Sequence, residues 1–434
     1  MMLSKKISWQ DPIIFAQRIA NNYSQENPCD SLVFLNSQLS DNKNKANSYL
    51  AIFSKEKLIT DDFFLAKKII SDSKQKWFGY FSYEIANQFE NFQKTSKSDI
   101  FENKIHFEQF HLIFEFNHQK KILTAYFSNQ LYLDCVLNYL PKKNTNLAFK
   151  IKKFSSNFSD QSYLKTIGEI RHKIAQGDLF QLNLTRKFFG EFTNKIDLAL
   201  AFNLFAEHSK LSQTNYSSFF KFGDLIIISA SPELFFKVKN KKILSCPIKG
   251  TASRSNNKKI DAQNLKNLKN STKECAENLM IVDLVRNDIS RVCEIGSVKV
   301  KKLFAVNSYK NIHHMSSQIH GKLKKDCDVF DALEALFPAG SMTGAPKIMA
   351  MNLIANYEKI DRGIYSGAIG VIDGDNDLNL AVVIRTLIIN KNKFELQFGG
   401  GITFESDTAM ELREVYNKAN SWFKVLGIKM RIKE

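Results

Sequence analysis

The sequence has few of the features that mark secreted, membrane-bound or thiolate-metal proteins. Among its 434 residues are six cysteines, and none of them forms a CxxC pair. Cysteines this sparse make no disulfide framework, so we expect reduced thiols and a cytoplasmic protein. No stretch approaches the roughly 18 consecutive apolar residues of a membrane span. The first residues also lead into no apolar signal segment, so we expect neither secretion nor membrane insertion.

Several nucleotide and metal motifs are also absent. The sequence has no GxxxxGK[ST] phosphate loop, no Rossmann glycine fingerprint, and no HExxH or Cys/His cluster for zinc. Basic residues are in excess, with 61 Lys and Arg against 44 Asp and Glu and a net charge of +17. These residues are scattered along the chain, so we expect no nucleic-acid partner. A positive field of this kind still favours small anionic substrates.

The apolar pattern predicts an α+β fold with mainly antiparallel sheets, because strands and helices do not alternate in a regular βαβ order. Residues 1–150 contain few clear turn or loop signals between their predicted elements, and we interpret them as an N-terminal region interlocked with the core. Residues 155–430 are dense in motifs and form the predicted catalytic domain. Strands are expected at 31–34, 77–83, 122–127, 225–228, 234–238, 381–389 and 394–398, and helices at 163–176, 328–336, 346–357 and 408–425.

One lysine has a setting that suits a nucleophile. Residues 246–251 read Cys-Pro-Ile-Lys-Gly-Thr, and the proline and glycine predict a tight turn around Lys249. An amine that is held away from water can lose its proton and attack an electrophilic carbon near neutral pH. A solvated surface lysine is the alternative, and this segment alone does not decide between them.

Two predicted helices begin with the same acidic pattern, Ser-x-x-Glu-x-x-Glu from Ser271 and Thr-x-x-Glu-x-x-Glu from Thr408. In each helix the hydroxyl residue and the first glutamate are expected to form a capping box. The second glutamate is not needed for capping and lies on the same helix face. If the two pairs face each other, their four carboxylates would hold a hard cation such as Mg²⁺. Two exposed acidic faces are the alternative. The four residues are Glu274, Glu277, Glu411 and Glu414.

Three further features are candidates for contact with a ligand. Gly399–Gly401 follows a predicted strand, and its amides could form a nest for a carboxylate, or the triplet could be a flexible turn. Arg385 lies in an apolar predicted strand, so it needs an anionic partner in a substrate or in the protein. His314 could be a general acid–base or a core histidine with a satisfied ring.

Taken together, these motifs resemble one family, the chorismate-utilising enzymes: anthranilate synthase component I, aminodeoxychorismate synthase component I, and the isochorismate and salicylate synthases. The resemblance covers about residues 155–425 and implies the anthranilate synthase component I-like α+β fold, with the active site between sheets and helices. The first 150 residues match only loosely, chiefly at Trp77-Phe78-Gly79-Tyr80. The segments that carry the resemblance, in order, are 177–186 (GDLFQLNLTR), 231–233 (SPE), 247–251 (PIKGT), 283–288 (DLVRND), 337–347 (FPAGSMTGAPK), 365–370 (YSGAIG) and the glycine triplet.

The resemblance also implies roles for single residues. Mg²⁺ would bridge the ring carboxylate of chorismate to Glu277 and Glu414, with Glu274 and Glu411 in support. Glu233 matches the general acid that protonates the departing C4 hydroxyl. The other implied site residues are Arg385, Tyr365 and Lys418 for the pyruvyl carboxylate, Gly399, Gly400 and Gly401 for the other carboxylate, Ser341 and Thr251 in the matching substrate-binding motifs, and Lys249, Gln181 and His314 among the catalytic residues.

Two positions select the reaction within this resemblance. Family members that add water carry a lysine where this chain has Gln181, and a glutamine cannot activate water, so the isochorismate and salicylate branch is disfavoured. Lys249 stands where anthranilate synthases typically have alanine. Aminodeoxychorismate synthases have a lysine there, which is thought to attack C2 as the C4 hydroxyl leaves. We therefore predict aminodeoxychorismate synthase component I, which makes 4-amino-4-deoxychorismate for 4-aminobenzoate and folate. Anthranilate synthase component I is the alternative.

The predicted reaction needs ammonia, and no cysteine lies in a turn typical of a glutaminase nucleophile. We therefore expect a separate glutamine amidotransferase subunit in a heterodimer, with free ammonium as another donor. The N-terminal region of relatives can bind tryptophan. Here Phe34-Leu35-Asn36-Ser37 departs from the usual Leu-Glu-Ser element, which leaves that site open.

Overall fold

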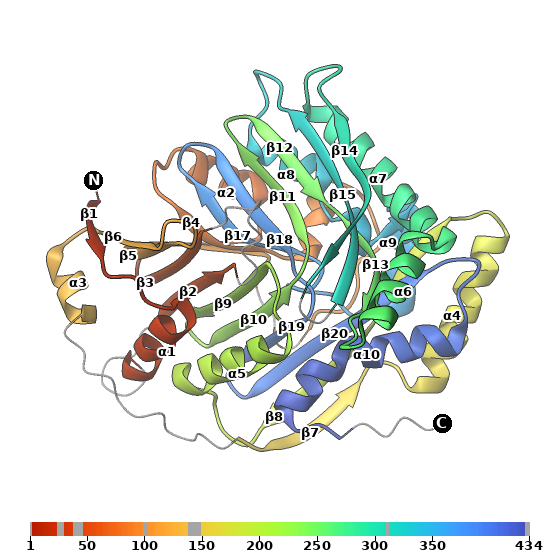
Figure 1. Cartoon of the computed structure of the whole chain (residues 1–434), viewed down its shortest axis with the longest axis horizontal. Helices are drawn as coiled ribbons and strands as arrows, with labels where there is room; N and C mark the ends of the chain where they lie inside the picture. Colours follow the sequence, from red (N-terminus) through yellow and green to blue (C-terminus); the bar gives the residue numbers. More distant parts are fainter. Residues whose placement is uncertain are drawn as a thin grey trace.

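The computed structural model describes residues 2–23, 30–37, 47–98, 100, 103–137, 149–309 and 312–429. Strands occupy the centre of the molecule and helices lie on its outer sides (Figure 1). Every pairing between the named strands is antiparallel. The predicted α+β class with mainly antiparallel sheets is therefore confirmed.

The first sheet spans most of the chain. In the order in which they pair, its strands are β1 (Leu3–Ile7), β6 (Ile122–Phe127), β5 (Ile105–Asn117), β3 (Ser48–Thr60), β2 (Ser31–Asn36), β9 (Tyr216–Phe222), β10 (Leu225–Ser231), β19 (Thr386–Asn390), β20 (Lys393–Ile402), β8 (Gln181–Phe192) and β7 (Ile151–Ser156). The short β16 (Gly344–Ala345) pairs with the start of β8.

The second sheet branches from the same long strand β5. Its order is β4 (Trp77–Phe81), β17 (Ala368–Asp373), β18 (Asp377–Val382), β11 (Leu234–Lys239), β12 (Lys242–Cys246) and β15 (Ile312–Lys322), and β15 also pairs with β13 (Ile248–Ser253) and β14 (Lys299–Ser308). Strands from the first 150 residues therefore pair with later ones in both sheets, β2 with β9 and β4 with β17.

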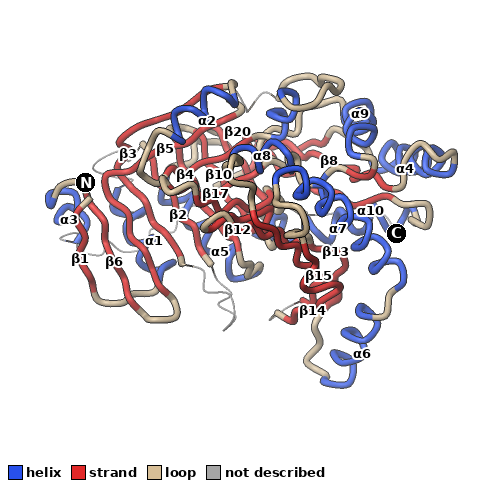
Figure 2. Tube along the Cα trace, turned by 90° about the horizontal axis from the view of Figure 1, so that it is seen from above, coloured by secondary structure: helices blue, strands red, loops and turns tan. Residues whose placement is uncertain are grey.

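The helices lie on the outer faces of the sheets, as Figures 1 and 2 show. They are α1 (Pro12–Tyr23), α2 (Phe63–Ser71), α3 (Gln130–Leu137), α4 (Asp160–Ala175), α5 (Leu198–Leu211), α6 (Lys258–Lys269), α7 (Thr272–Val292), α8 (Val329–Leu336), α9 (Lys347–Glu358) and α10 (Thr408–Leu426), with the 3₁₀ turns η1 (Tyr83–Gln88) and η2 (Gly340–Met342). Seen from above, α7, α10 and β13 lie together, away from the N-terminus (Figure 2). The predicted helices are confirmed to within a few residues.

The alternation of side chains along the strands explains the layers. In β2, Phe34 packs against Phe202 and Phe205 of α5, whereas Val33 belongs to the core between the sheets. Trp77 of β4 likewise joins the core under α7 and α8, and Phe78 joins the core between the sheets. Because successive strand residues point to opposite faces, at these positions one face is buried against helices and the other against the partner sheet.

The predicted strand at residues 381–389 is wrong, because it is two strands separated by a break. β18 ends at Val382 and β19 begins at Thr386. Arg385, between them, has a φ of 53°, which regular, unbulged strand backbone does not adopt. The freed backbone of Val383 instead exchanges hydrogen bonds with Ser366 and Gly367. This break presents Arg385 at the site described below.

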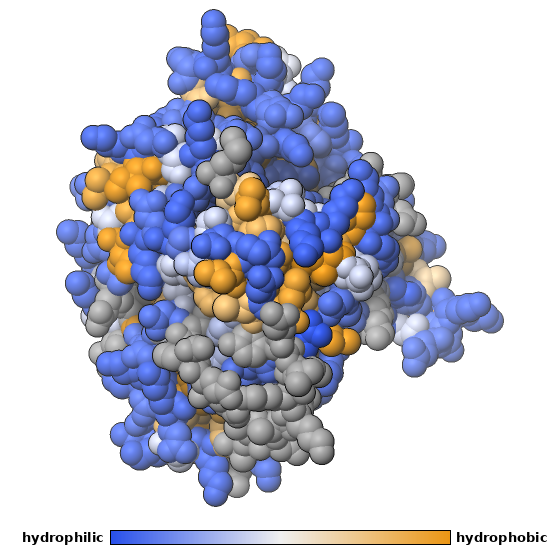
Figure 3. All heavy atoms as spheres, turned by 90° about the vertical axis from the view of Figure 1, so that its left-hand side faces the viewer, coloured by the Kyte–Doolittle hydropathy of each residue, from blue (hydrophilic) through white to orange (hydrophobic). Residues whose placement is uncertain are grey.

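The sequence predicts reduced cysteines and no membrane-spanning segment. Cys135, Cys246, Cys275, Cys293 and Cys327 are free thiols, and Cys29 lies outside the described residues. Among the residues described, no helix has both the length and the apolar character needed to cross a membrane. On the face drawn in Figure 3, hydrophilic side chains predominate and hydrophobic ones occur in small groups.

Candidate active site

The first acidic pair lies at the start of α7, as predicted. The Ser271 side chain caps this helix by accepting a hydrogen bond from the Glu274 amide. The predicted capping box is only half formed, because the Ser271 amide donates to the Leu268 carbonyl rather than to the Glu274 side chain. Glu277 lies one turn further on and is buried. Burial raises the pKa of the Glu277 carboxyl, Lys249 opposes that rise, and Glu274 adds to it. The pair is therefore a set of partly desolvated carboxylates that lack a full counter-charge.

The second acidic pair lies at the start of α10, but its predicted cap is wrong. Asp407, not Thr408, is the N-cap, and its carboxylate accepts from the Met410 amide. Glu411 is instead held by Ser406, whose hydroxyl donates to its Oε1 at 2.7 Å. The side chain of Glu414 is 48% exposed and pairs with Lys418 at 2.6 Å. Burial would raise the pKa of Glu414, but Lys418, together with Lys249 and Lys273, more than offsets burial, and the pKa is lowered.

The two pairs face each other, with one lysine between them. The ammonium of Lys273 lies 4.0 Å from the Glu277 carboxylate and 3.8 Å from that of Glu411. Burial raises the pKa of Glu274 and of Glu411, and in both cases Glu414 raises it further. Two exposed acidic faces, the alternative interpretation, would not show this mutual repulsion.

The donor set of this carboxylate cluster suits a hard divalent cation. It consists of carboxylate oxygens, which Mg²⁺ prefers, and their raised pKa values indicate negative charge that the protein leaves partly uncompensated. Within the described ranges, however, no three His, Cys, Asp or Glu side chains are arranged to hold a metal ion. These carboxylates would therefore have to move closer together to bind one, and a cation there stays a prediction.

The glycine triplet is neither a turn nor a nest, which corrects the prediction. Gly399, Gly400 and Gly401 continue β20 and pair with β8. β19 pairs with β20 only as far as Leu396, so that strand does not cover the edge of the triplet. A carbon added at Gly400 would lie 3.1 Å from Glu411 Oε2. The missing side chains therefore let the acidic helix approach the strand.

Lys249 lies in strand β13 rather than in a tight turn, so that prediction is also wrong. The register of β13 against β15 shifts between Ile248 and Thr251, and Gly250 has a φ of 82°. This bulge aims the half-buried lysine toward the end of the first sheet. A carbon added at Gly401 would lie 2.9 Å from Lys249 Nζ and 2.5 Å from Gln181 Nε2. Three predicted site residues from three strands therefore converge.

Gln181 is fully buried at the start of β8, and its side chain lacks partners. Neither Oε1 nor Nε2 forms a hydrogen bond with the described residues. Leaving a buried amide unpaired costs about 1–3 kcal/mol. A ligand that hydrogen-bonds to Gln181 would recover this energy, so the amide marks a polar ligand position next to Lys249.

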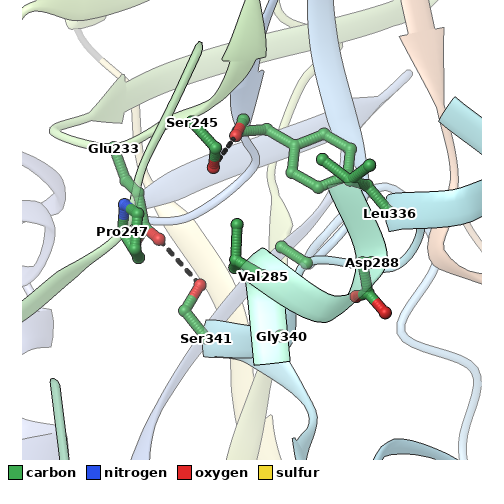
Figure 4. A pocket seen from close by; sticks show the side chains of 10 residues that line it. Glu233, Ser245, Pro247, Val285, Asp288, Leu336, Gly340 and Ser341 are labelled. Carbon is green, nitrogen blue, oxygen red and sulfur yellow. Dashed lines mark hydrogen bonds between the residues drawn. The ribbon is translucent and has the colours of Figure 1, made fainter. Parts of the chain in front are cut away.

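Glu233, between β10 and β11, has the protonation expected of a general acid. It is 5% exposed and accepts a hydrogen bond of 2.7 Å from the Ser341 hydroxyl. Burial raises its pKa to about 7, against the opposing effects of Ser341 and Lys249. Figure 4 shows Glu233 and Ser341 beside a narrow cavity of about 10 Å³, the space of about one water molecule. The carboxyl can thus hold a proton near neutral pH.

Arg385 does not lie in a strand, which corrects the prediction, and no carboxylate of the described residues forms an ion pair with it. Its backbone carbonyl accepts from Trp422 Nε1 at 2.9 Å, which fixes the residue. Within the described part of the chain, its guanidinium forms no ion pair or hydrogen bond. Burial lowers the pKa of Arg385, and the nearby Glu233 raises it. An unpaired guanidinium of this kind favours a ligand carboxylate.

His314 is buried, and its setting does not fit a satisfied core histidine. It lies on β15 opposite Thr251 of β13. Neither ring nitrogen has a hydrogen-bond partner among the described residues. Burial, with Arg385 nearby, lowers the pKa of His314 to about 3, so the ring is neutral. It can therefore accept or donate one hydrogen bond to a ligand, which leaves its predicted catalytic role open.

Three other predicted residues lie at the borders of the site. Tyr365 is 4% exposed in the segment that binds the backbone of Val383, and burial raises the pKa of its hydroxyl. Lys418 donates to the Gly399 carbonyl at 2.8 Å and so links α10 to the glycine strand. Thr251 is exposed at the edge of β13.

The sequence alone did not point to a buried ionic network beneath the site. Arg362 makes two hydrogen bonds to the Glu358 carboxylate, at 2.9 and 2.7 Å, and donates to the carbonyls of Met342 and Asn183. These contacts fix the segments that carry Ser341, Tyr365 and Gln181. An Arg–Glu pair four residues apart at a helix end has no distinctive pattern, so only the fold reveals it.

Comparison with known proteins supports the family that the sequence motifs resemble. The profile of the family described as "chorismate binding enzyme" matches residues 24–424. Anthranilate synthase component 1 of Acetivibrio thermocellus is 33% identical over 377 residues, which are 80% of this chain and 74% of that protein. The protein of the same name from Pseudomonas aeruginosa is 36% identical over 276 residues, 63% of this chain and 55% of that protein.

Solved structures agree in fold. Anthranilate synthase component I from Streptococcus pneumoniae TIGR4 has a TM-score of 0.78 at 27% identity, covering 88% of this chain and 93% of that chain. The menaquinone-specific isochorismate synthase from Escherichia coli has a TM-score of 0.79 at 17% identity, covering 98% and 94%, and it shows the fold alone. The predicted anthranilate synthase component I-like fold is confirmed, and this chain belongs to the chorismate binding enzymes.

Proposed function

We propose that this protein aminates chorismate with ammonia at C4, as the component I subunit of an aminodeoxychorismate synthase. The position of Lys249 carries this proposal. Its amine lies beside the unpaired amide of Gln181 and the open edge of Gly401, and its charge acts on Glu277 and Glu233. An alanine at this position would supply no nucleophile.

The proposed reaction balances with the groups that surround this amine. Lys249 attacks C2 of the ring, the ring double bonds shift, and the C4 hydroxyl leaves as water with a proton from Glu233. The pKa of about 7 allows Glu233 to carry that proton. Ammonia then attacks C4, the double bonds shift back, and the lysine leaves C2 as the free amine. The new ammonium at C4 gives its extra proton to Glu233, which restores the acid. The product keeps its pyruvyl group, and chorismate and ammonia yield 4-amino-4-deoxychorismate and water.

Substrate binding would use the unpaired guanidinium of Arg385 and the uncovered edge of Gly399–Gly401. Arg385 would hold the pyruvyl carboxylate with Tyr365 and with Lys418, which would have to give up part of its pairing with Glu414, and the glycine edge would hold the ring carboxylate. Glu277 and Glu414, supported by Glu274 and Glu411, would hold Mg²⁺. When bound, this ion would neutralise the ring carboxylate and so favour loss of the C4 hydroxyl.

The ammonia would come from a separate glutamine amidotransferase subunit, with free ammonium as a substitute in vitro. Nothing in the proposed steps generates ammonia from the chain's own residues. The proposed setting is cytoplasmic and the proposed product serves 4-aminobenzoate and folate synthesis.

Anthranilate synthase component I is the second candidate, and the relatives favour it over our first proposal. Both curated proteins compared above bear that name, as does the more similar of the two solved structures. In that reaction ammonia adds at C2 and pyruvate leaves. Lys249 would then serve only to balance the charge of the substrate.

The test is to incubate the protein with chorismate, Mg²⁺ and ammonium and to identify the product by mass and fluorescence. The proposal predicts a product that retains the pyruvyl group. Anthranilate with an equal amount of pyruvate would contradict it and establish the second candidate.

A further inference from the structure

The inner face of the second sheet carries lysines that the site itself does not use. In β11, Val238 packs in the core under the helices, so Lys237 points to the opposite face, toward the first sheet. The strand register places Lys237 beside Leu244, Leu244 beside His320, and His320 beside Lys299. Along this row of paired residues, Lys237 and Lys299 therefore lie on either side of His320.

The next row, closer to the site, is also basic. Lys302 of β14 pairs with Gln318, two residues before His320. Lys237, Lys301 and Lys302 are exposed, and within the described residues none of them forms an ion pair. Lys322, two residues after His320 on the same strand, has its own carboxylate, Glu294 at 2.7 Å, and the three lysines differ from it in that respect.

Two titrating groups report the field of these lysines. Burial lowers the pKa of His320, and Lys301, Lys237 and Lys302 lower it further, with no carboxylate opposing them. Burial raises the pKa of the Cys246 thiol, Lys237 and Lys302 lower it, and Glu233 raises it. Cys246 thus lies between the lysines and the acid of the active site.

We propose that Lys237, Lys301 and Lys302 form a cationic surface that attracts the anionic substrate and guides it along this face toward Glu233. This inference rests on the proposed function only in taking chorismate, a dicarboxylate, as the substrate. Unpaired surface charges of one sign raise the local concentration of an oppositely charged ligand. They act before the ligand reaches the reacting groups, so they affect capture rather than chemistry.

The test compares a double variant, Lys237→Gln/Lys302→Gln, with a control of equal charge change, Lys5→Gln/Lys6→Gln. Lys5 and Lys6 are exposed on β1, at the far edge of the first sheet. Chorismate consumption is measured with Mg²⁺ and ammonium over a range of salt concentrations. We expect kcat/KM of the double variant to fall roughly 3–10-fold at low salt, with kcat unchanged and with the loss disappearing near 1 M salt, where the Debye length is about 3 Å.

Other outcomes decide against the inference. Wild-type kcat/KM in the double variant at low salt would overturn it, as would an equal loss in the control, which would indicate net charge alone. Lys237→Arg/Lys302→Arg should keep the wild-type value, and unfolding curves check that the variants fold. Chorismate consumption is followed whichever product forms, so a finding of anthranilate would overturn the proposed function and leave the cationic surface standing.

Discussion

Two buried polar clusters of this protein differ in one respect, the pairing of their groups. In the network under the site, Arg362 is bound on all its nitrogens by Glu358, Met342 and Asn183. In the site itself, Gln181, His314 and Arg385 have no hydrogen-bonding or ionic side-chain partner among the described residues. Since unpaired buried polar groups destabilise a fold, the second cluster is the one that needs a ligand.

The comparison separates residues that stabilise the fold from residues that are available to bind a ligand. Changes in the paired network should lower the stability of the protein and affect turnover only through folding. Changes in the unpaired cluster should lower turnover and leave stability unchanged or higher. The following predictions are ordered from the largest expected effect to the smallest.

Glu277→Gln should abolish turnover, because it removes an anionic ligand from the predicted cation site. The free energy of unfolding should be unchanged or higher without Mg²⁺, because burial and Glu274 already disfavour the ionised carboxyl. Turnover with added Mg²⁺ and thermal unfolding in a chelator measure both effects. Activity that is indifferent to the chelator and to this substitution would remove the cation from the account.

Glu233→Gln should reduce turnover by roughly 10²–10⁴-fold, the usual loss for a general acid. In the wild type, only the protonated acid is active, so the contribution of Glu233 to kcat/KM should be complete below its pKa of about 7 and fall tenfold per pH unit above it. The same raised pKa means that ionisation of Glu233 destabilises the folded state. Protonation of Glu233 therefore stabilises the folded state. This stabilisation is complete near pH 4.5 and is lost as the pH rises through 7. A pH–rate profile of the variant that keeps this limb would mean that another group supplies the proton.

Glu358→Gln should cost about 3–5 kcal/mol of folding free energy, because it leaves the buried Arg362 charge without its partner. Denaturant unfolding measures this loss. Near-wild-type stability would break the comparison, since the paired network would then contribute little to the fold.

Gln181→Met should raise the free energy of unfolding by about 1 kcal/mol, because it removes an unsatisfied amide of similar volume. Thr185→Val is the matched control on the same strand. The Thr185 hydroxyl donates to Glu358 at 2.7 Å, so its loss should cost about 1 kcal/mol. Opposite signs in the two variants support the comparison, and equal signs contradict it.

The sequence allowed the fold class to be predicted, and it singled out residues that the structure brings together, such as Lys249, Gln181 and Gly401, but it did not reveal the backbone that presents them. Capping at Ser271 could be read correctly because its partner is three residues away, and Asp407 was missed because a neighbouring threonine fits the same pattern. The triplet at Gly399 and the turn at Lys249 were misjudged because long-range pairing holds both segments in strands. The break at Arg385 depends on hydrogen bonds to the Tyr365 segment, which no local pattern in the sequence reveals.

The central claim is that Lys249 directs ammonia to C4, and the most direct measurement is the product ratio of the wild type and Lys249→Ala with chorismate, Mg²⁺ and ammonium. The account predicts 4-amino-4-deoxychorismate from the wild type and loss of most of that product in the variant. It also predicts a covalent adduct at Lys249 in the intact mass of Glu233→Ala protein after incubation with chorismate. Anthranilate and pyruvate from the wild type would contradict the claim.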